Sequence, residues 1–257
     1  MELMGVAKLE PQLLQGLRRQ DPRWMWLADV MCRHYADICI YHTGADGSAA
    51  YSHGPFTHTT HDTAAFRSTH RMYPAEGPKY GIQYSSGGPN AGHCYVASLA
   101  QHYYLTGNRT SREAFLEVAD WSVHSPWFTR MMMGDKRGVG NLLATQVYAY
   151  QLTADRKYYE AAVKMIDYEG NDKPYSGLGG TLFIKALGRF LDVKMEREEL
   201  DADYAKAREK MLSFGDLYLV PPASNYEGYL EQRCFHAEVL FTCYLHAPED
   251  HPRRKEY

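Results

Sequence analysis

The amino-acid sequence predicts an all-α fold built from antiparallel helical hairpins. Apolar residues recur at helical spacing through most of the chain, as Val96, Ala97 and Ala100 do. The segment Tyr103–Arg109 is also repeated at Tyr150–Arg156, with an offset of about 47 residues, which falls in the range of helical-hairpin repeats. A third and looser copy follows further on. Together the stripes and the repeat predict hairpins in series.

The first long helix is expected to begin at Asp21-Pro22. Aspartate is a favourable N-cap, and proline fits the first helical turn, where its missing N–H is not needed. Apolar residues then recur over about five turns. We therefore expect one buried face on this helix, formed by Trp24, Leu27, Ala28, Met31, Cys32, Tyr35 and Ile38.

Residues 44–91 are predicted to form a long functional loop. Helical periodicity stops after Gly44, apart from one short candidate helix near Ala64–Met72. Irregular connections longer than about 15 residues are uncommon inside compact domains and are often functional. This loop and its edges also hold half of the 12 histidines of the chain, namely His42, His53, His58, His61, His70 and His93.

Three hairpins should follow the loop. The first should have Asn90 as its N-cap and should end its first helix at Gly107, which can adopt the left-handed conformation. In the later copies glycines should precede the first helix, and the third copy should turn near Asp192. These glycines are Gly138 and Gly140 in the second copy and Gly179 and Gly180 in the third.

The apolar stripes of the hairpins should face the core. For these hairpins we expect burial of Ala97, Ala100, Leu105, Phe115, Val118, Leu152, Val163 and Leu187. Pro221-Pro222 then breaks the chain, and a last helix should follow. Its stripe is expected at Leu230, Cys234, Ala237, Phe241 and Leu245.

Composition narrows the classes of partner. With 45% hydrophobic residues, residues 1–257 can bury a core as a single domain. The net charge of -3 favours neither nucleic acid nor an anionic membrane surface. The five cysteines include no CxxC pair and are interpreted as reduced core residues. There is no membrane-spanning apolar run and no signal peptide, so as it stands the chain is predicted to be cytoplasmic. Its charged end at 251–257 leaves room for further domains of a longer chain.

The histidines offer two kinds of chemistry. His93 lies in a first helical turn, where the helix dipole disfavours the imidazolium, so the side chain could act as a base near neutral pH. The plainer interpretation is a structural histidine at a helix start. His58, His61 and Asp62 have a spacing that zinc can use, but the sequence places no further ligand. We therefore expect neither a metal nor another cofactor.

Cationic and aromatic residues in the same loop could bind a carboxylate and an apolar ring face. Arg67 and Arg71 are four residues apart on the short candidate helix and could together bind a carboxylate, although a solvated charged face is an equal alternative. Tyr80 and Tyr84 are loop tyrosines that could act in proton transfer or stack on a sugar ring.

Helical hairpins in series, with glycine-rich loops, resemble the (α/α) toroids of carbohydrate-active enzymes. The segments Gly92–Val96 and Tyr103–Asn108 are similar to a hairpin of rhamnogalacturonan-lyase-like proteins and six-hairpin glycosidases. The similarity covers roughly residues 87–168. It implies a toroid that binds a polysaccharide or oligosaccharide at its loop-bearing end. Because the predicted helices are too few for a complete ring, the toroid would be partial or further helices would lie in segments without periodicity.

Three functions remain open from the sequence. A lyase acting by β-elimination needs a base and a group that stabilises the enolate, and the loop supplies both types of residue. For this function we assign His93, Tyr80 and His61 to catalysis, and Arg67, Arg71, Asn90, Tyr84 and His58 to substrate binding. A glycoside hydrolase would need a carboxylate pair, for which Asp46, Asp62, Glu76 and Glu227 are the candidates. A non-catalytic helical scaffold would need neither set.

Overall fold

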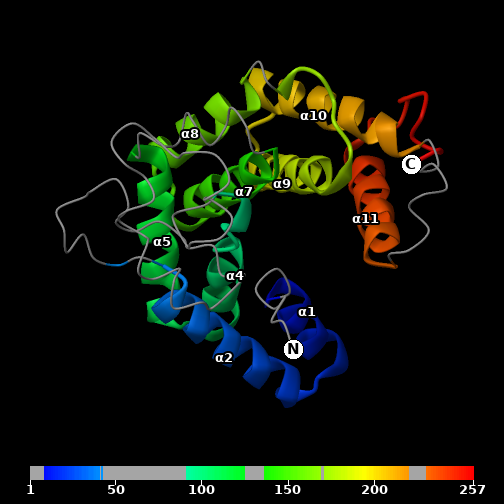
Figure 1. Cartoon of the computed structure of the whole chain (residues 1–257). Helices are drawn as coiled ribbons and strands as arrows, with labels where there is room; N and C mark the ends of the chain where they lie inside the picture. The colour runs from blue at the N-terminus through cyan, green and yellow to red at the C-terminus, as the bar shows by residue number, and fades with distance from the viewer. Residues whose placement is uncertain (1–8, 41, 43–90, 125–135, 169–170, 220–229) are drawn as a thin grey trace, which may run out of the picture. The chain divides into compact units, whose positions relative to one another are not determined.

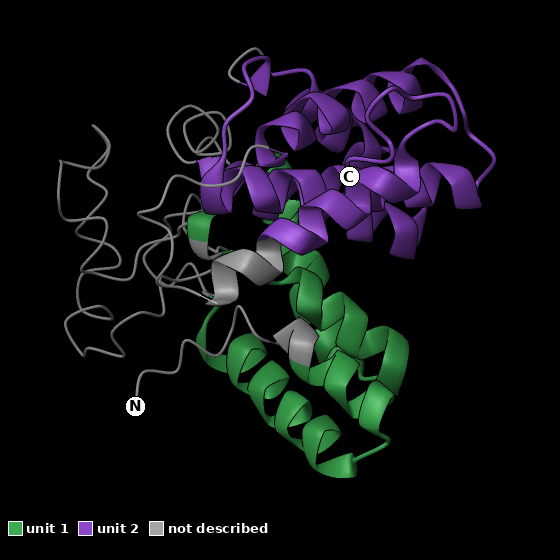
Figure 2. Ribbon diagram, turned by 90° about the vertical axis from the view of Figure 1, so that its right-hand side faces the viewer, with its two compact units in different colours: residues 1–131 green, residues 132–257 purple. Residues whose placement is uncertain are grey.

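The computed structural model of the chain describes residues 9–40, 42, 91–124, 136–168, 171–219 and 230–257. Within these residues the secondary-structure elements are helices, with no β-strand, which confirms the all-α class (Figure 1). Two compact units divide the chain, residues 1–131 and 132–257 (Figure 2). The single domain expected over residues 1–257 stays a prediction.

The first unit holds two helical hairpins. They are α1 (Leu9–Arg19) with α2 (Pro22–Ile38), and α4 (Ala97–Thr106) with α5 (Arg109–His124), preceded by the 3-10 turn η2 (Ala91–His93). Helix α2 packs on α1, α4 and α5. Near the C-terminal end of α2, the fully buried Tyr35 accepts a hydrogen bond from the backbone N–H of Tyr95 at 3.1 Å. The predicted helix at Asp21-Pro22 is confirmed, with the Asp21 side chain accepting from the Arg23 N–H.

The second unit continues the same plan. Its hairpins are α7 (Lys136–Thr153) with α8 (Arg156–Ile166), and α9 (Gly177–Glu196) with α10 (Ala202–Gly215), followed by η4 (Asp216–Tyr218) and α11 (Leu230–His246). Helix α9 is central, since it packs on α7, α10 and α11. The first helices of successive hairpins are thus neighbours, and α8 and α10 pack on α7 and α9.

Helices α7 and α9 lie side by side and parallel. Near their N-terminal ends, a Cβ added at Gly140 would lie 2.7 to 2.8 Å from Leu182 and the backbone of Phe183. Near their C-terminal ends, Gln151 accepts from Arg189 at 2.6 Å and its side-chain amide donates to Glu196 at 3.1 Å. Two parallel helices with matched ends are the expected product of hairpins that repeat in register.

Helix α11 extends this parallel layer. Lys185 of α9 forms an ion pair with Glu238 at 2.8 Å, and Asp192 lies 3.4 Å from His246. Both the α9 and the α11 positions advance in the same direction along the chain. Helices α7 and α11 therefore each run along α9 in the same sense as α9 itself where they contact it.

All four hairpins turn through a residue in the left-handed conformation. The prediction for Gly107 is confirmed, with φ of 71°. The other three turns place a residue with a side chain there: Gln20 (φ 51°), Ala154 (φ 58°) and Glu198 (φ 58°). These three are the non-glycine residues with positive φ in the described chain. The hairpin of α1 and α2, which the sequence repeat had not revealed, is thereby the same kind of unit.

Each turn is followed by an acidic or amide side chain that caps the next helix. Asp21 and Asp155 accept from a backbone N–H two residues on, and Asn108 and Asp201 from one three residues on, at 3.0 to 3.1 Å. Such caps satisfy amides that have no partner inside the helix. The four hairpins are therefore alike mainly in the conformation of their turns and in the caps that follow, and less in the residues on their helix faces.

Glycine-based expectations were wrong at several helix starts. Gly138 and Gly140 lie inside α7 and are buried, and at Gly140 the backbone of α9 comes too close for a side chain. The helix expected from Asn90 begins only at Ala97, after η2. Helix α9 continues past Asp192 to Glu196, since its stripe of buried residues also continues.

The predicted core was partly right. Ala100, Phe115, Val118 and Leu187 are fully buried, but Leu105 is 43% exposed at the end of α4. Ala97, Leu152 and Val163 are half-buried. On α11 the expected stripe was the wrong face: Val239 and Cys243 are buried, whereas Ala237, Phe241 and Leu245 are exposed.

Candidate functional site

The residues predicted to act on a substrate fall mainly outside the described part of the chain. This holds for His58, His61, Arg67, Arg71, Tyr80, Tyr84 and Asn90, and for the alternative acids Asp46, Asp62, Glu76 and Glu227. Of the predicted set only His93 belongs to a described element, η2, and its side chain is not described. The predicted site as a whole therefore stays a prediction.

Most of these residues lie in the long segment between His42 and η2, and the described residues on both sides of this segment belong to the first unit. His42 follows α2, and its Nδ1 lies 2.7 Å from the Glu117 carboxylate of α5. Its Nε2 lies 2.5 Å from the carbonyl oxygen of Ala36. Carboxylate and carbonyl oxygens both accept hydrogen bonds, so each ring nitrogen of His42 faces an acceptor. His42 thus ties the start of the segment to α2 and α5.

A second polar cluster of the first unit joins α2, α4 and α5. His102 Nδ1 lies 2.9 Å from the Ser111 hydroxyl, and His102 Nε2 lies 3.4 Å from the Asp29 carboxylate. Burial lowers the pKa of His102, Asp29 raises it and Arg33 lowers it further, with a net shift below the usual range. The imidazole is therefore neutral near pH 7; its Nδ1 shares a hydrogen bond with the Ser111 hydroxyl, and its buried Nε2 lies near Asp29 without forming a hydrogen bond.

This cluster has the residue types of a Ser-His-Asp triad but not its access. His102 is completely buried and Ser111 is 2% exposed. A nucleophile must reach a substrate carbonyl, and here helices surround the hydroxyl. We therefore interpret Asp29, His102 and Ser111 as a polar network that joins three helices.

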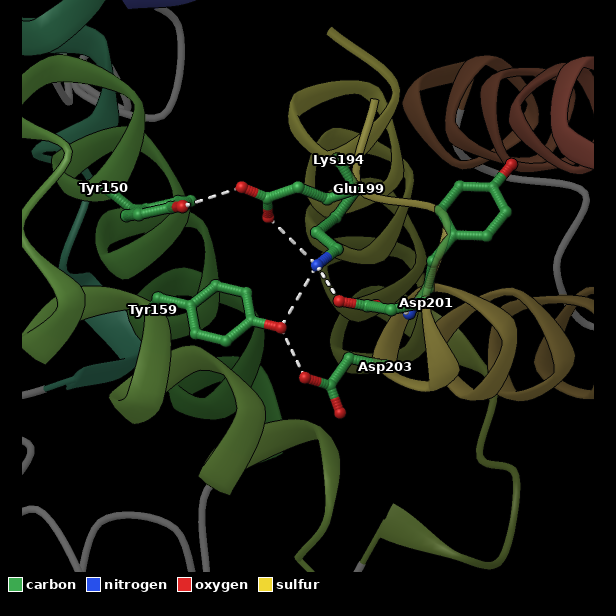
Figure 3. Close-up of polar contacts among 7 residues, drawn as sticks. Tyr150, Tyr159, Lys194, Glu199, Asp201 and Asp203 are labelled. Atoms are coloured by element: carbon green, nitrogen blue, oxygen red, sulfur yellow. Dashed lines mark hydrogen bonds and ion pairs between the residues drawn. The ribbon is translucent and has the colours of Figure 1, made fainter. Parts of the chain in front are cut away.

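The second unit contains a cluster around Lys194 (Figure 3). The Lys194 ammonium, 1% exposed, donates to Asp201 at 2.6 Å, Glu199 at 3.0 Å and the Tyr159 hydroxyl at 3.2 Å. The Tyr159 hydroxyl in turn donates to Asp203. The group thus links α8, the end of α9 and the start of α10.

Two arginines and a further tyrosine extend this cluster. Tyr150 donates to Glu199 at 3.4 Å. The guanidinium of Arg197 lies 4.3 Å from the centre of the Tyr150 ring, and that of Arg156 lies at the same distance from the Tyr159 ring. Such cation–π contacts add modestly to stability at partly exposed sites. Arg156 and Arg197, which make these contacts, stand at the hairpin turns 154–155 and 197–201.

Charge and protonation in this cluster are fixed near neutral pH. Burial lowers the pKa of Lys194, but hydrogen bonds to Asp201, Tyr159 and Glu199 outweigh it, and the pKa lies above its usual range. Burial together with the bond to Asp203 raises the pKa of Tyr159 to about 12. For Asp201 burial raises the pKa, yet the bonds from Lys194 and the backbone lower it overall.

The Lys194 cluster is therefore suited to hold helices and not to move protons. Its ammonium stays charged, its phenol stays protonated, and its carboxylates accept bonds from Lys194, Tyr150 and Tyr159. A general base must exchange its proton near the working pH. We assign the cluster to stability.

The described cysteine thiols are also unsuited to catalysis. Burial raises the pKa of the Cys32, Cys39 and Cys243 thiols to about 12. These three and Cys94 are buried and free, which confirms the reduced-core prediction for them. No group of three or more His, Cys, Asp or Glu side chains within the described residues could hold a metal ion. No described helix is long and apolar enough to cross a membrane.

Sequence reasoning missed both buried clusters. Lys194 stands seven residues after Leu187 on the apolar stripe of α9, and a lysine at such a position signals a buried ion pair. His102 had a weaker signal, since it lies three residues after the buried Leu99. Their partners come from other helices, and sequence spacing does not reveal them.

Comparison with known proteins gives no match: no family model, no curated protein and no solved structure is significantly similar to this chain.

Proposed function

We propose that this chain is a carbohydrate-active enzyme that cleaves an acidic polysaccharide or oligosaccharide by β-elimination. The observation that supports it best is the unequal length of the connections. Within hairpins, only residues 20–21, 107–108, 154–155 and 197–201 separate the helices. Between hairpins, the described α-helices are further apart along the sequence, separated by residues 39–96, 125–135, 167–176 and 216–229, of which η2 and η4 are part.

The residues between one hairpin and the next always precede the N-terminal end of the following helix, which is α4, α7, α9 or α11. Helices α7, α9 and α11 are parallel, so in the second unit these ends lie on one side. Loops gathered at one end of a helical array are where binding residues usually occur. A partial (α/α) toroid, which the sequence resembles, would bind a glycan at this end.

The charge at the same end favours an anionic substrate. The N-terminal ends of parallel helices carry partial positive charge. Lys136 and Arg137 add two cations in the first turn of α7, and the Lys136 ammonium lies 4.8 Å from the centre of the Tyr175 ring. These contacts belong to the second unit taken by itself, where the combination would attract a carboxylate group such as that of a uronate.

The chemistry would be carried by the segment between His42 and α4. His93 would remove the proton next to the uronate carboxylate, while Arg67, Arg71 and Asn90 would stabilise the enolate that forms. A hydroxyl or imidazole, Tyr80 or His61, would protonate the leaving oxygen as the glycosidic bond breaks. Tyr84 and His58 would position the sugar.

The test is the ultraviolet absorbance of the unsaturated uronate product, measured over a panel of uronic-acid polysaccharides. Wild-type protein should generate this absorbance on at least one substrate. His93→Ala should reduce the rate on the order of 10²-fold, as expected for a lost general base, and His124→Ala, beyond the hairpin turn, should not. Reducing ends without absorbance would indicate a hydrolase instead, and binding without any product would indicate a scaffold.

A further inference from the structure

We propose that Tyr35 and His42 are positioning residues for residues 43–90, because they hold both ends of this segment at the C-terminal end of α2. Most of the side chains predicted to act on a substrate belong to this segment. The positioning role of Tyr35 and His42 rests on the proposed function, whereas the junction of the two ends belongs to the fold of the first unit and can be tested without a substrate.

The first end leaves α2 and turns back onto it. Cys39 and Ile40, which follow the helix, are buried. The Nε2 of His42 then lies 2.5 Å from the carbonyl oxygen of Ala36, in the last turn of α2. Its Nδ1 lies 2.7 Å from the carboxylate of Glu117 on α5. Two helices therefore hold this end before the segment begins.

The second end returns to the neighbouring residue of α2. Ala91 of η2 and Cys94 after it are buried. The backbone N–H of Tyr95 donates to the hydroxyl of Tyr35 at 3.1 Å, 60 residues earlier in the chain. Tyr35 is fully buried and directly precedes Ala36, the residue that His42 contacts. The two ends of the segment thus contact adjacent residues of α2.

Electrostatic contacts of Tyr35 also involve both ends. Burial raises the pKa of Tyr35, and the thiols of Cys94 and Cys39 raise it further, one from each end of the segment. Both cysteines therefore lie close to the same phenol. Bringing the ends of a long loop together costs chain entropy, which contacts at the junction must offset. Tyr35 and His42 supply two contacts of this kind.

The junction would set the position of the predicted base relative to the rest of the proposed site. His93 belongs to η2 at the second end, whereas Arg67 and Arg71 belong to the segment itself. A displacement of about 1 Å in a catalytic arrangement can reduce the rate on the order of 10²-fold. Release of one end would therefore slow the chemical step more than it weakens substrate binding.

The first experiment measures hydrogen exchange by mass spectrometry on the full chain without substrate. His42→Leu removes both contacts of the first end. It should accelerate exchange of residues 91–96, at the second end, roughly fivefold or more, as expected for the loss of one hydrogen bond. Helix α1 should keep its protection. His42→Gln, whose side-chain amide can still donate, should recover most of the protection at 91–96.

Arg23→Gln is the matched control. It breaks an exposed ion pair of 2.7 Å with Asp21 at the opposite end of α2, so exchange of residues 91–96 should equal that of wild type. Unchanged exchange of these residues in His42→Leu would overturn the proposal, because the two ends would then be independent. A loss of protection that extends through α1 would also overturn it, since His42 would then stabilise the whole unit without joining the two ends.

The second experiment measures kcat and KM on the substrate that wild type cleaves. His42→Leu should lower kcat roughly tenfold and leave KM within about twofold, which is the pattern of lost alignment and not of lost binding. An unchanged kcat would overturn the positioning role. A wild-type protein that forms no unsaturated product would overturn the proposed function and the positioning role with it, while the exchange result would still decide whether the two ends are joined.

Discussion

The two compact units use the same hairpin but secure it with different groups. Behind its turns the first unit buries a neutral imidazole, His102, which faces Ser111 and Asp29. The second buries an ammonium, Lys194, bonded to two carboxylates. Burial lowers the pKa of His102 below the usual histidine range, so this group stays neutral at neutral pH, whereas Lys194 stays charged. The His102 cluster of the first unit should therefore respond to mildly acidic conditions that leave the Lys194 cluster of the second unit unchanged.

Close helix contacts differ in the same way. In the first unit a Cβ at Gly16 would meet the Met25 side chain, 2.5 Å from its sulfur. In the second unit a Cβ at Gly140 would meet Leu182 and the backbone of Phe183 at 2.7 to 2.8 Å. A methionine side chain can change rotamer, whereas helix backbone cannot yield without moving α9. The contact at Gly16 can therefore adapt to an added side chain, whereas the contact at Gly140 cannot.

The largest expected effect follows from this contrast. Gly140→Ala should destabilise the second unit by about 3 kcal/mol, because overpacking would force α7 and α9 apart. Gly16→Ala should be nearly neutral, since Met25 can move and alanine favours a helix. Hydrogen exchange of α7 and α9 against α1 and α2 measures both. Equal losses of protection in the two variants would remove the distinction between flexible and rigid contacts.

Lys194→Met should come next, at about 2 kcal/mol. The substitution keeps the apolar stem but leaves Tyr159, Glu199 and Asp201 without their shared donor, and hydrogen bonds to charged groups are each worth roughly 1.5 to 3 kcal/mol. Glu199 and Asp201 are partly exposed and can be hydrated, so the estimate stays below the sum. Lys157→Met, which removes an exposed ion pair, is the control and should have little effect in urea unfolding.

Acidification should also lower the stability of the first unit through His102, with a smaller effect than the substitutions above. The pKa of His102 is lowered in the folded state by burial, so the unfolded chain binds a proton first as pH falls. The stability that neutral His102 contributes is complete above about pH 6.5 and declines below it, with a slope of at most about 1.4 kcal/mol per pH unit. The protection of α4 and α5 amides, after correction for the slower intrinsic exchange at lower pH, should therefore fall at mildly acidic pH.

Residues around Lys194 should not follow that trend. The pKa of Lys194 is raised and that of Asp201 is lowered, so the ion pair persists until pH falls toward the carboxyl range. His246, whose pKa is lowered by burial, gives the second unit an acid-sensitive contact of its own between α9 and α11. Peptides from α8 and the 197–203 turn therefore provide the comparison. Acid-induced exchange there that equals the change in α4 would contradict the assignment.

The sequence predicted the hairpins better than the faces that pack. Periodicity and caps located most helices, because both depend on neighbours along the chain. Gly140 and the exposed Phe241 were misjudged because their environment depends on how closely α9 approaches α7 and α11. The candidate site was predicted from loop composition alone, while the buried clusters of His102 and Lys194 depend on partners from other helices and could not be seen in sequence spacing.

The smallest effect compares one turn between the units. Gly107 and Ala154 occupy equivalent left-handed positions, with φ of 71° and 58°, and a left-handed residue with a Cβ costs roughly 1 kcal/mol. Ala154→Gly should therefore stabilise the second unit, and Gly107→Ala should destabilise the first, each by about 1 kcal/mol, with Gly107→Val costing about 1 to 2 kcal/mol. A Cβ at Gly107 meets nothing within 4 Å, so the loss would come from the backbone alone. Thermal unfolding of the two single variants and of the double exchange measures this. Opposite shifts that nearly cancel in the double variant are expected, and shifts of the same sign would show that the two turns are not equivalent.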